Sequence, residues 1–581
     1  MPLMSRVFFQ ALFTAAMVPV AFAADEAAAA SKTEPVLGLP TLHSIGMHWI
    51  IAGDANQNAQ VRVTWRSGNG AWHEGQPLLR VEKDAQKPEK GHGSIDVPEG
   101  ARLYAGSLLL LQPNMNYEIK LSLVDPDGGS LEKILKAHTA AEPTDPKGAT
   151  VYHVAPGDGG SRGTAAAPFL GLKTAEKHAQ PGTIFLLHAG TYPAETVFKQ
   201  SGEPGQPIIW RAAGDGEVIF DGTAPKENAD RLITASELHD VWFEGLTLRH
   251  ADKGLVGNGS ARIVVRGCHL SDVEYGIVVT RNEGDTVRGW FVADNVIEGI
   301  STWPRTKGIE NARGIQITGE GHDICYNRIR GFADAIDTFP SPRCTDIDFH
   351  HNELTELTDD GMELDYSERN VRCFENRLTN VFQGISTQPV FGGPVYIFRN
   401  ALYNVGHEPF KLHNSPSGVL IYHNTVVKHE EPISVQTGAP IRNSRMRNNL
   451  FIGHGGPYAF ESSAKMKDCD FDYGGFGGGP WKMFLKWNNE RYATPDEAKA
   501  KAPAWKHTVI LDAAATFAQG TLPPADEKPI QKPMDLRLKT GSAAIDAGEV
   551  LPGVNDSFAG KAPDLGAYEW GAELPAYGPR K

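Results

Sequence analysis

The sequence predicts an all-β protein, in which a small antiparallel β-sandwich precedes a parallel β-helix of about ten coils. Three observations predict this fold. Asparagine recurs at a nearly fixed interval through the middle of the chain. Residues 36–142 alternate between apolar and polar side chains with a period of two. The 581 residues include 62 glycines and 39 prolines, a share that favours turn-rich β structure over a helical bundle.

The charge balance excludes one class of function. The chain has 56 Lys and Arg against 70 Asp and Glu, a formal net charge of −14. A nucleic-acid-binding protein usually has a basic domain or stripe, and none is present, so no nucleic-acid partner is expected. Charged residues at 22% and hydrophobic residues at 41% are typical of a globular chain.

The first residues have the pattern of a secretory signal peptide. Arg6 precedes an apolar run over 7–20, and Ala21-Phe22-Ala23 then provides a cleavage site, so residues 1–23 are predicted to be removed. Residues 24–35 are expected to form a linker. The mature chain is expected to be a monomer that does not insert stably into a membrane. It would lie in the periplasm or outside the cell, which a signal peptide does not distinguish.

Residues 36–142 are predicted to form the β-sandwich, with Trp65 as its core tryptophan. The run from Leu111 to Tyr117 resembles the tyrosine corner of fibronectin type III domains, which implies that fold for this segment.

The sequence pattern changes after residue 148, and residues 149–469 are predicted to form the β-helix. Turn motifs such as Gly190-Thr191-Tyr192 and the run over 214–222 resemble the opening coils of secreted right-handed parallel β-helix proteins, several polysaccharide lyases among them. That resemblance implies a right-handed helix.

The repeat is carried by seven asparagines, each placed after a β-rich run. After a first gap of 32 residues, the spacing is 24 or 25 residues. One amide per coil can bond the turn backbone, and stacked amides would form a hydrogen-bonded ladder. The ladder is predicted to comprise Asn295, Asn327, Asn352, Asn376, Asn400, Asn424 and Asn449.

The same period predicts which side chains point inward and which outward. An apolar residue recurs once per coil and is assigned to the core, so its neighbours point outward and stack ~4.8 Å apart on successive coils. The inward residues are Ile315, Ile336, Met362, Ile385, Phe410 and Ile433. The outward columns are Arg313, Asp334, Asp360, Gln383 and Glu408; Gln316, Asp337, Glu363, Ser386, Lys411 and Ser434; and Thr318, Phe339, Asp365, Gln388, His413 and Gln436.

The remaining segments are expected to close the solenoid. Residues 470–530, with Trp481, Trp487 and a short helix over 494–501, are predicted to be an excursion that packs on the β-helix. Residues 531–575 are predicted to form a terminal coil and cap, because an open last coil would expose strand edges. Most of the five cysteines are expected to be buried thiols, with at most one or two disulfides.

Carboxylates gather at matching positions of two consecutive coils. The carboxylates of such a group repel one another unless a cation lies among them or some of them are protonated. Calcium is a candidate cation, because it takes six to eight oxygen ligands. A solvated acidic surface is the alternative interpretation. The group comprises Asp334, Asp337, Asp359, Asp360, Glu363 and Asp365.

Three motifs here resemble family-nine polysaccharide lyases, which are calcium-dependent pectate-type β-helix enzymes. Residues 359–364 (DDGMEL) resemble their DDGxDL motif, residues 333–335 their ADG element and residues 410–412 their FKL element. The resemblance implies calcium as cofactor, a uronate polysaccharide as substrate and β-elimination as the reaction. It implies that Asp334, Asp359, Asp360 and Glu363 hold the metal and that Lys411 removes the C5 proton.

This sequence departs from that family at two points. Glu363 stands in place of the motif's last aspartate. Glu363 and Lys411 are 48 residues apart, which is about two coils or ~10 Å along the axis, instead of about one coil.

Two other functions remain open. Asp337 and Glu363 on adjacent coils could be the carboxylate pair of a glycoside hydrolase, at ~5 Å for a retaining enzyme. His413 is a candidate acid or base in either reaction, and Arg369, Tyr366, Gln388 and Asp365 are candidate substrate contacts.

A non-catalytic binding or adhesive β-helix is the third alternative, although the outward columns contain only one aromatic residue, Phe339. The polysaccharide, endo or exo action, and the role of the sandwich are not determined by the sequence.

Overall fold

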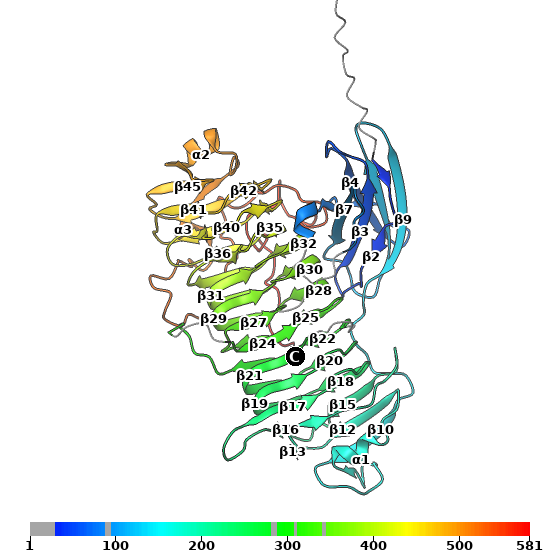
Figure 1. Cartoon of the computed structure of the whole chain (residues 1–581). Helices are drawn as coiled ribbons and strands as arrows, with labels where there is room; N and C mark the ends of the chain where they lie inside the picture. Colours follow the sequence, from blue (N-terminus) through cyan, green and yellow to red (C-terminus); the bar gives the residue numbers. More distant parts are fainter. Residues whose placement is uncertain (1–28, 87–94, 281–286, 307–310, 340–343, 581) are drawn as a thin grey trace, which may run out of the picture.

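The computed structural model describes residues 29–86, 95–280, 287–306, 311–339 and 344–580. The predicted signal peptide lies outside these residues. In the part of the chain described, no helix is long and apolar enough to cross a membrane. The protein is a parallel β-solenoid with an antiparallel β-sandwich packed beside its upper half (Figure 1).

The N-terminal region is built from two antiparallel sheets around one apolar core. Trp49 is fully buried in this core, whereas Trp65 is only partly buried at its edge, so the prediction that Trp65 is the core tryptophan is wrong. The Tyr117 hydroxyl accepts a hydrogen bond from the Gln112 backbone N–H at 2.9 Å. The first paired strand already begins at Ala30. One sheet contains β1 (Ala30–Ser31), β2 (Val36–Leu37), β3 (Ile45–Ala52), β7 (Ala101–Leu108) and β6 (Leu79–Arg80); the other contains β5 (His73–Glu74), β4 (Gln60–Ser67), β8 (Asn116–Val124) and β9 (Ser130–His138); η1 spans Lys83–Gln86.

The solenoid has about 12 turns, slightly more than the ten expected. Its first parallel sheet contains β11 (Phe169–Leu170), β10 (Thr150–Ala155), β12 (Thr183–Leu187), β15 (Ile208–Ala212), β18 (Val241–Glu244), β20 (Val264–Arg266), β22 (Phe291–Ala293), β25 (Asp323–Cys325), β28 (Cys344–His350), β30 (Ser367–Phe374), β32 (Phe391–Phe398), β35 (Ser417–Tyr422), β38 (Ile441–Arg442), β42 (Met466–Lys467), β39 (Arg445–Arg447) and β43 (Asp470–Phe471).

The second parallel sheet carries the acidic residues. It contains β13 (Gly190–Tyr192), β14 (Thr196–Val197), β16 (Val218–Asp221), β17 (Ala229–Thr234), β19 (Leu246–Val256), β21 (His269–Val279), β23 (Val296–Gly299), β24 (Arg313–Ile317), β26 (Arg328–Arg330), β27 (Asp334–Asp337), β29 (Glu353–Glu363), β31 (Arg377–Ser386), β33 (Ala401–Val405), β34 (Phe410–Lys411), β36 (Thr425–Val427), β40 (Leu450–Gly453), β44 (Gly475–Gly478) and β47 (Val509–Leu511). A small third sheet contains β37 (Ile433–Val435), β41 (Tyr458–Ser462), β45 (Met483–Trp487) and β46 (Glu490–Tyr492).

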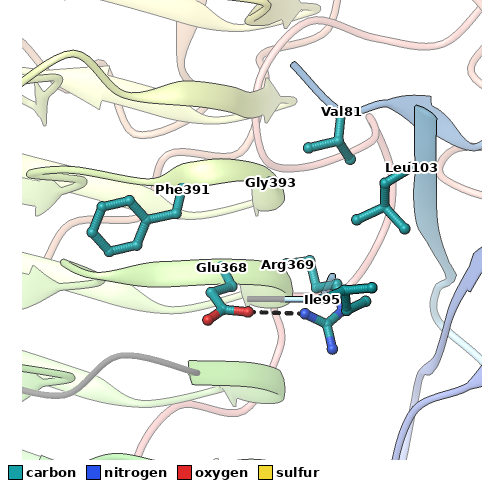
Figure 2. Close-up of a pocket in the computed structure, with 7 residues that line it drawn as sticks. All are labelled: Val81, Ile95, Leu103, Glu368, Arg369, Phe391 and Gly393. Carbon is teal, nitrogen blue, oxygen red and sulfur yellow. Dashed lines mark hydrogen bonds and ion pairs between the residues drawn. The ribbon is translucent and has the colours of Figure 1, made fainter. Parts of the chain in front are cut away.

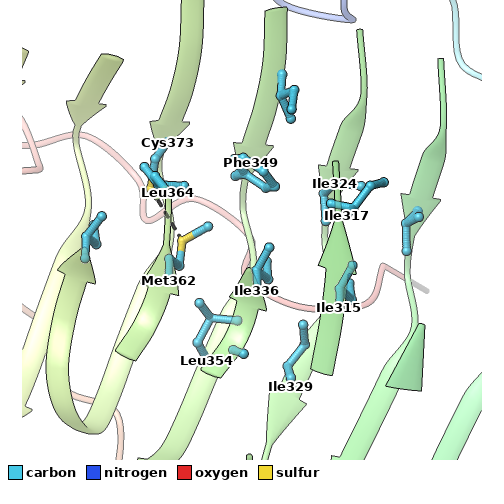
Figure 3. Close-up of a cluster of buried hydrophobic side chains, with 14 of the residues drawn as sticks. Ile315, Ile317, Ile324, Ile329, Ile336, Phe349, Leu354, Met362, Leu364 and Cys373 are labelled. Carbon is cyan, nitrogen blue, oxygen red and sulfur yellow. Dashed lines mark hydrogen bonds between the residues drawn. The ribbon is translucent and has the colours of Figure 1, made fainter. Parts of the chain in front are cut away.

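The predicted interior of the solenoid is confirmed. The six residues assigned to the core are fully buried, and Figure 3 shows several of them with their neighbours on successive coils. All seven predicted asparagines are also fully buried. Each of the first six donates from Nδ2 to Oδ1 of the next at 2.9–3.1 Å, and Asn449 donates to the carbonyl of Ile421. Each coil therefore presents both an apolar layer and one satisfied amide to its neighbours.

The C-terminal part differs from the prediction. Residues 470–511 are not an excursion, because β44 and β47 extend the second sheet in register beyond β40. This extension accounts for the larger number of turns. The helices are short: α1 (Leu172–Glu176) lies near the N-terminal end of the solenoid, with α2 (Pro495–Lys501) and α3 (Ala513–Thr516) near the other (Figure 1).

Residues 531–580 form no further coil in the described structure. Leu536, Ala544 and Leu565 pack in one apolar cluster with Leu450 of β40, outside the solenoid core. The chain then returns along the outside, where the Gly578 N–H donates to the carbonyl of His351 at 3.0 Å. The tail therefore covers the flank of several coils instead of adding a coil at the end.

No disulfide is formed by the five cysteines. Four of them are buried, and Cys469 is partly buried. Cys373 Sγ lies 3.4 Å from Met362 Sδ inside the core (Figure 3).

The sandwich is fixed to the solenoid by a buried polar network. Arg372 and Asp348, both fully buried, pair at 2.5 Å between Nε and Oδ1. From the sandwich side, Thr41 Oγ1 donates to Asp348 Oδ2 at 2.6 Å and Ser107 Oγ accepts from Arg372 Nη1 at 3.2 Å. Since a buried charge is tolerated only when it is paired and hydrogen-bonded, these contacts fix one orientation of the two domains.

Candidate functional site

The acidic residues lie on two neighbouring strands of the second sheet, β27 and β29, with Asp365 just after β29, as the predicted columns require. Asp337 pairs in register with Glu363, Glu363 with Ser386, and Ser386 with Lys411. The preceding apolar residues point into the core, so these side chains point outward. They are nevertheless largely buried, because the side chains cover one another: Asp337 is 0%, Asp360 1% and Asp334 3% exposed.

Three of the carboxylates are arranged as a candidate metal site. Asp334, Asp359 and Asp360 each offer an oxygen, and these oxygens all lie within 4.8 Å of one another. No other group of three or more His, Cys, Asp or Glu within the described residues has this spacing. Asp360 Oδ1 is buried without a hydrogen-bond partner. A hard cation with oxygen ligands fits this set.

The fourth predicted metal ligand, Glu363, lies outside this trio. It occupies the neighbouring outward column, three residues after Asp360, where it faces Asp337 on the previous coil and Asp365. Its Oε2 is buried without a hydrogen-bond partner. Asp365 accepts hydrogen bonds from Ser386 Oγ at 2.8 Å and from the Gln388 N–H at 2.6 Å.

Three cations flank the cluster. Lys411 Nζ lies 2.8 Å from Asp360 Oδ2, and Arg305 Nη1 lies 3.1 Å from Asp359 Oδ1. Arg313 pairs with Asp337, and its Nε lies 3.7 Å from Asp334 Oδ2. Sequence reasoning gave no role to the two arginines. Arg313 stands in the same outward column as Asp334, so its contact with the acidic cluster could be predicted from the sequence. Nothing in the sequence indicates that Arg305 folds back over Asp359.

The position of Lys411 resolves the spacing anomaly of the motifs. Its backbone is two coils from β29 and one coil beyond Gln383, yet its side chain extends back across the intervening coil to Asp360. Gln383 and Ser386 on that coil are small or uncharged and leave the path open. The long lysine side chain therefore places its amine at the trio despite the 48-residue separation from Glu363.

Burial and mutual repulsion perturb the acidity of the cluster. Burial, followed by the charges of Glu363 and Asp360, raises the pKa of Asp334 well above its usual range. Burial raises the pKa of Asp360 to about 7 against the opposing effect of Lys411, and burial together with Asp337 raises the pKa of Glu363 to about 7. Burial raises the pKa of Asp337 and Asp365 too. Six carboxyl groups stand against three cations, so full ionisation of the cluster is unfavourable without a further cation.

The pKa of Lys411 is shifted in favour of its charged form, whereas the pKa shifts of the carboxyl groups favour their neutral forms. Burial alone would lower the pKa of the amine, but the Asp360 carboxylate, with Asp365 and Asp359, outweighs burial and holds that pKa above its usual value. Lys411 is therefore an ammonium ion in the structure as it stands, and not the amine with a lowered pKa expected for a base beside a cation.

His413 lies two residues beyond Lys411 on the same outward side. Its Nε2 is 2.8 Å from Oε2 of Glu408, which is fully buried, although the angle does not make a hydrogen bond. The other oxygen of Glu408 accepts from the Gln436 N–H. His413 is thus held by a buried carboxylate two coils beyond Asp360 of the trio.

Two of the four predicted substrate contacts, Tyr366 and Arg369, have different surroundings. Tyr366 stands between two aromatic rings, with ring centroids 5.5 Å from Phe339 and 5.9 Å from Phe391. Arg369 donates to Glu368 at 2.9 Å and faces the sandwich, where it lines a small hollow with Ile95 and Leu103 (Figure 2). Arg369 is therefore a residue of the domain junction.

The molecule is thus a parallel β-solenoid with a carboxylate-rich candidate site on one outward face. No protein-family model matches the chain. It is similar to pectate lyase L of Dickeya chrysanthemi, with 24% identity over 445 residues, which cover 72% of this chain and 90% of that protein. It is also 30% identical to the uncharacterised protein YwoF of Bacillus subtilis over 136 residues, but spans only 28% of that protein's length.

Among solved structures, the chain is similar to a GH136 lacto-N-biosidase from Eubacterium ramulus, with 12% identity and a TM-score of 0.40 over 55% of this chain and 67% of that one. It is also similar to an alginate lyase from Paenibacillus sp. str. FPU-7, with 16% identity and a TM-score of 0.30 over 51% of this chain and 94% of that one.

Proposed function

We propose that this protein is a carbohydrate-active enzyme that cleaves a uronate-containing polysaccharide by calcium-assisted β-elimination. The observation that carries the proposal is the trio Asp334, Asp359 and Asp360 with the Lys411 amine 2.8 Å from its Asp360 member. Sequence similarity to pectate lyase L over most of both chains supports the same reaction class. Export from the cytoplasm and a fibronectin type III-like sandwich remain part of the proposal.

The residues of the trio fit calcium by charge and by ligand type. Six carboxyl groups stand against Arg305, Arg313 and Lys411, so the fully ionised cluster would carry excess negative charge that a divalent cation would offset. The buried Asp360 Oδ1 has no protein partner and is free to accept a ligand. Bound calcium would neutralise the uronate carboxylate and so acidify the proton at C5.

Lys411 is the proposed base. Its Nζ lies 2.8 Å from Asp360 Oδ2, and its side chain is 11% exposed. Asp360 is shared between the trio and the ammonium group, so a cation held by the trio would compete with Lys411 for this carboxylate and would favour the neutral amine. The amine can then accept the C5 proton, and the glycosidic bond at C4 breaks as the double bond forms.

His413 is proposed to donate a proton to the departing oxygen. It is on the same outward side as Lys411, and the buried carboxylate of Glu408 beside its Nε2 orients the ring. Gln388 and Asp365, one and two coils earlier in the same column, are proposed to contact the substrate.

Hydrolysis by Asp337 and Glu363 is the second candidate function. It is favoured by the pairing of these two groups in register on adjacent coils. Burial raises the pKa of both carboxyl groups: Arg313 and Gln316 oppose that rise at Asp337, and the pKa of Glu363 reaches about 7, as a general acid requires.

One assay separates the two functions. Uronate and neutral polysaccharides are incubated with the protein in calcium and in a chelator, and both the ultraviolet absorbance of unsaturated products and new reducing ends are measured. Calcium-dependent absorbance on a uronate polymer is the expected result. New reducing ends without absorbance would assign the reaction to Asp337 and Glu363, and the absence of both products would contradict an enzymatic function on these polymers.

A further inference from the structure

Three aromatic side chains from successive coils stand in a row beside the acidic cluster. Phe339 follows β27, Tyr366 follows β29, and Phe391 begins β32. Their ring centroids are 5.5 and 5.9 Å apart, close to the ~4.8 Å spacing of the coils, and neighbouring rings are tilted by 52° and 57°. Phe339 is 38% exposed, and Tyr366 and Phe391 are partly exposed. The row runs parallel to the solenoid axis.

The backbone ties this aromatic row to the cluster on each coil. The Phe339 N–H donates to the carboxylate of Asp337. Tyr366 directly follows Asp365, and its N–H donates to the carbonyl of Pro389, next to the Gln388 N–H that binds Asp365. The rings therefore lie within a few residues of the proposed chemistry on three consecutive coils.

At its far end the row meets the sandwich. Phe391 and Glu368 lie one above the other on neighbouring coils, and Val81, Ile95 and Leu103 of the sandwich face this surface across a small hollow (Figure 2). The Arg369 guanidinium lies in the same hollow and is 17% exposed. The buried Arg372 network keeps the sandwich in place, so it is a fixed wall of the hollow.

We propose that Phe339, Tyr366 and Phe391 form a row of sugar-binding subsites, in which a uronate-containing oligosaccharide lies parallel to the solenoid axis. The C–H face of a pyranose packs on an aromatic ring. The hollow beyond Phe391 has a volume of only about 10 Å³, so it holds no sugar ring and the sandwich marks the end of the row. This inference rests on the proposed function, which supplies the substrate class.

The row differs from ordinary core packing in its position. The solenoid core has its own aromatic and aliphatic layers inside the sheets, whereas these three rings lie outside them next to buried charge. A partly exposed phenylalanine next to a buried acidic cluster adds little to folding but offers a surface to a sugar ring.

The test measures binding of oligogalacturonates of increasing length by calorimetry. The Lys411→Ala variant is used in calcium, so that bound sugar is not consumed. Adding Tyr366→Ala or Phe391→Ala is expected to weaken binding about three- to tenfold each. Tyr366→Phe keeps the ring and should bind as the parent does. Phe391→Ala should affect long oligomers more than short ones, because Phe391 lies at the end of the row nearest the sandwich.

Trp570→Ala is the matched control, since Trp570 is a 45% exposed aromatic residue on the C-terminal tail. Thermal unfolding of each variant checks that it is folded. Equal affinities for Tyr366→Ala, Phe391→Ala and Trp570→Ala would overturn the inference while leaving the proposed function intact. A parent protein that neither binds nor cleaves any uronate polymer would overturn the proposed function and the subsites with it.

Discussion

Two polar columns run along the same solenoid and are built in opposite ways. In the ladder of seven asparagines every amide is fully buried and bonded to the amides and backbone of adjacent coils. In the acidic columns the side chains are also buried, but they carry like charges, and Asp360 Oδ1 and Glu363 Oε2 lack hydrogen-bond partners. A satisfied buried column stabilises the fold, whereas an unsatisfied charged column costs stability and is retained for binding or chemistry.

The largest expected effect is on catalysis. Lys411→Ala should lower the rate of β-elimination by about 10²–10⁴-fold while leaving the fold intact, because it removes the base and no ladder contact. The rate of formation of unsaturated product measures this effect. Lys411→Arg is the control, since it keeps a cation beside Asp360 but does not provide a neutral base. Full activity in Lys411→Ala would exclude this lysine as the base.

The second prediction concerns the metal. In the structure the Asp360 N–H donates to Asp334 Oδ1 at 3.0 Å. Asp334→Asn keeps an oxygen that can accept this hydrogen bond but removes one ionisable carboxyl group from the trio. Calcium affinity measured by calorimetry should fall by about tenfold or more. In chelator the same variant should unfold at an equal or higher temperature than the parent, because repulsion is relieved.

Asp272→Asn is the matched control for the metal experiment, since Asp272 is 65% exposed. It should change neither calcium affinity nor the unfolding temperature. Unchanged affinity in Asp334→Asn would show that the acidic column does not bind calcium through this residue.

The third prediction concerns the ladder. Asn376→Ala removes the acceptor of the Asn352 N–H and the donor to the Phe349 carbonyl. The free energy of unfolding in urea should fall by about 3 kcal/mol, because buried backbone groups lose their partners. Activity per folded molecule should not change. Asn69→Ala, on an exposed turn, should have little effect, and an equal loss there would contradict a special role for the ladder.

The last prediction concerns acid stability, where no effect is expected at neutral pH. Burial lowers the pKa of His322 to about 3, and both ring nitrogens are used: Nδ1 accepts from the Trp290 N–H, and Nε2 donates to the Thr318 carbonyl. In the unfolded chain the imidazole of His322 binds a proton near pH 6.5, whereas in the folded chain it stays neutral at that pH. Stability from this group is therefore complete above about pH 6.5 and is lost as the pH falls toward 3.

This acid dependence can be measured in a variant. In His322→Gln the free energy of unfolding, followed by urea titration from pH 7 to pH 4 at about unit intervals, should fall less steeply than in the parent. Equal slopes in the two proteins would mean that His322 does not contribute to this dependence.

The periodic features were accessible from the sequence because a coil repeats every 24 or 25 residues through this region. The ladder from Asn295 to Asn449, the inward residues and the outward acidic columns all follow from that one period. The prediction failed where the chain leaves the period. Residues 470–511 lack the asparagine signal but still extend the stack, and the tail after residue 531 packs along the flank instead of adding a coil.

The sequence by itself determined the layers of the solenoid and the column of each carboxylate, because strand alternation and a fixed repeat assign every side chain to a face. Only the tertiary structure decided which charges meet. Arg305 folds over Asp359, Lys411 extends across a coil to Asp360, and the sandwich docks beside Phe391 and Arg369. These contacts depend on side-chain reach and on the docking of distant segments, which no local period encodes.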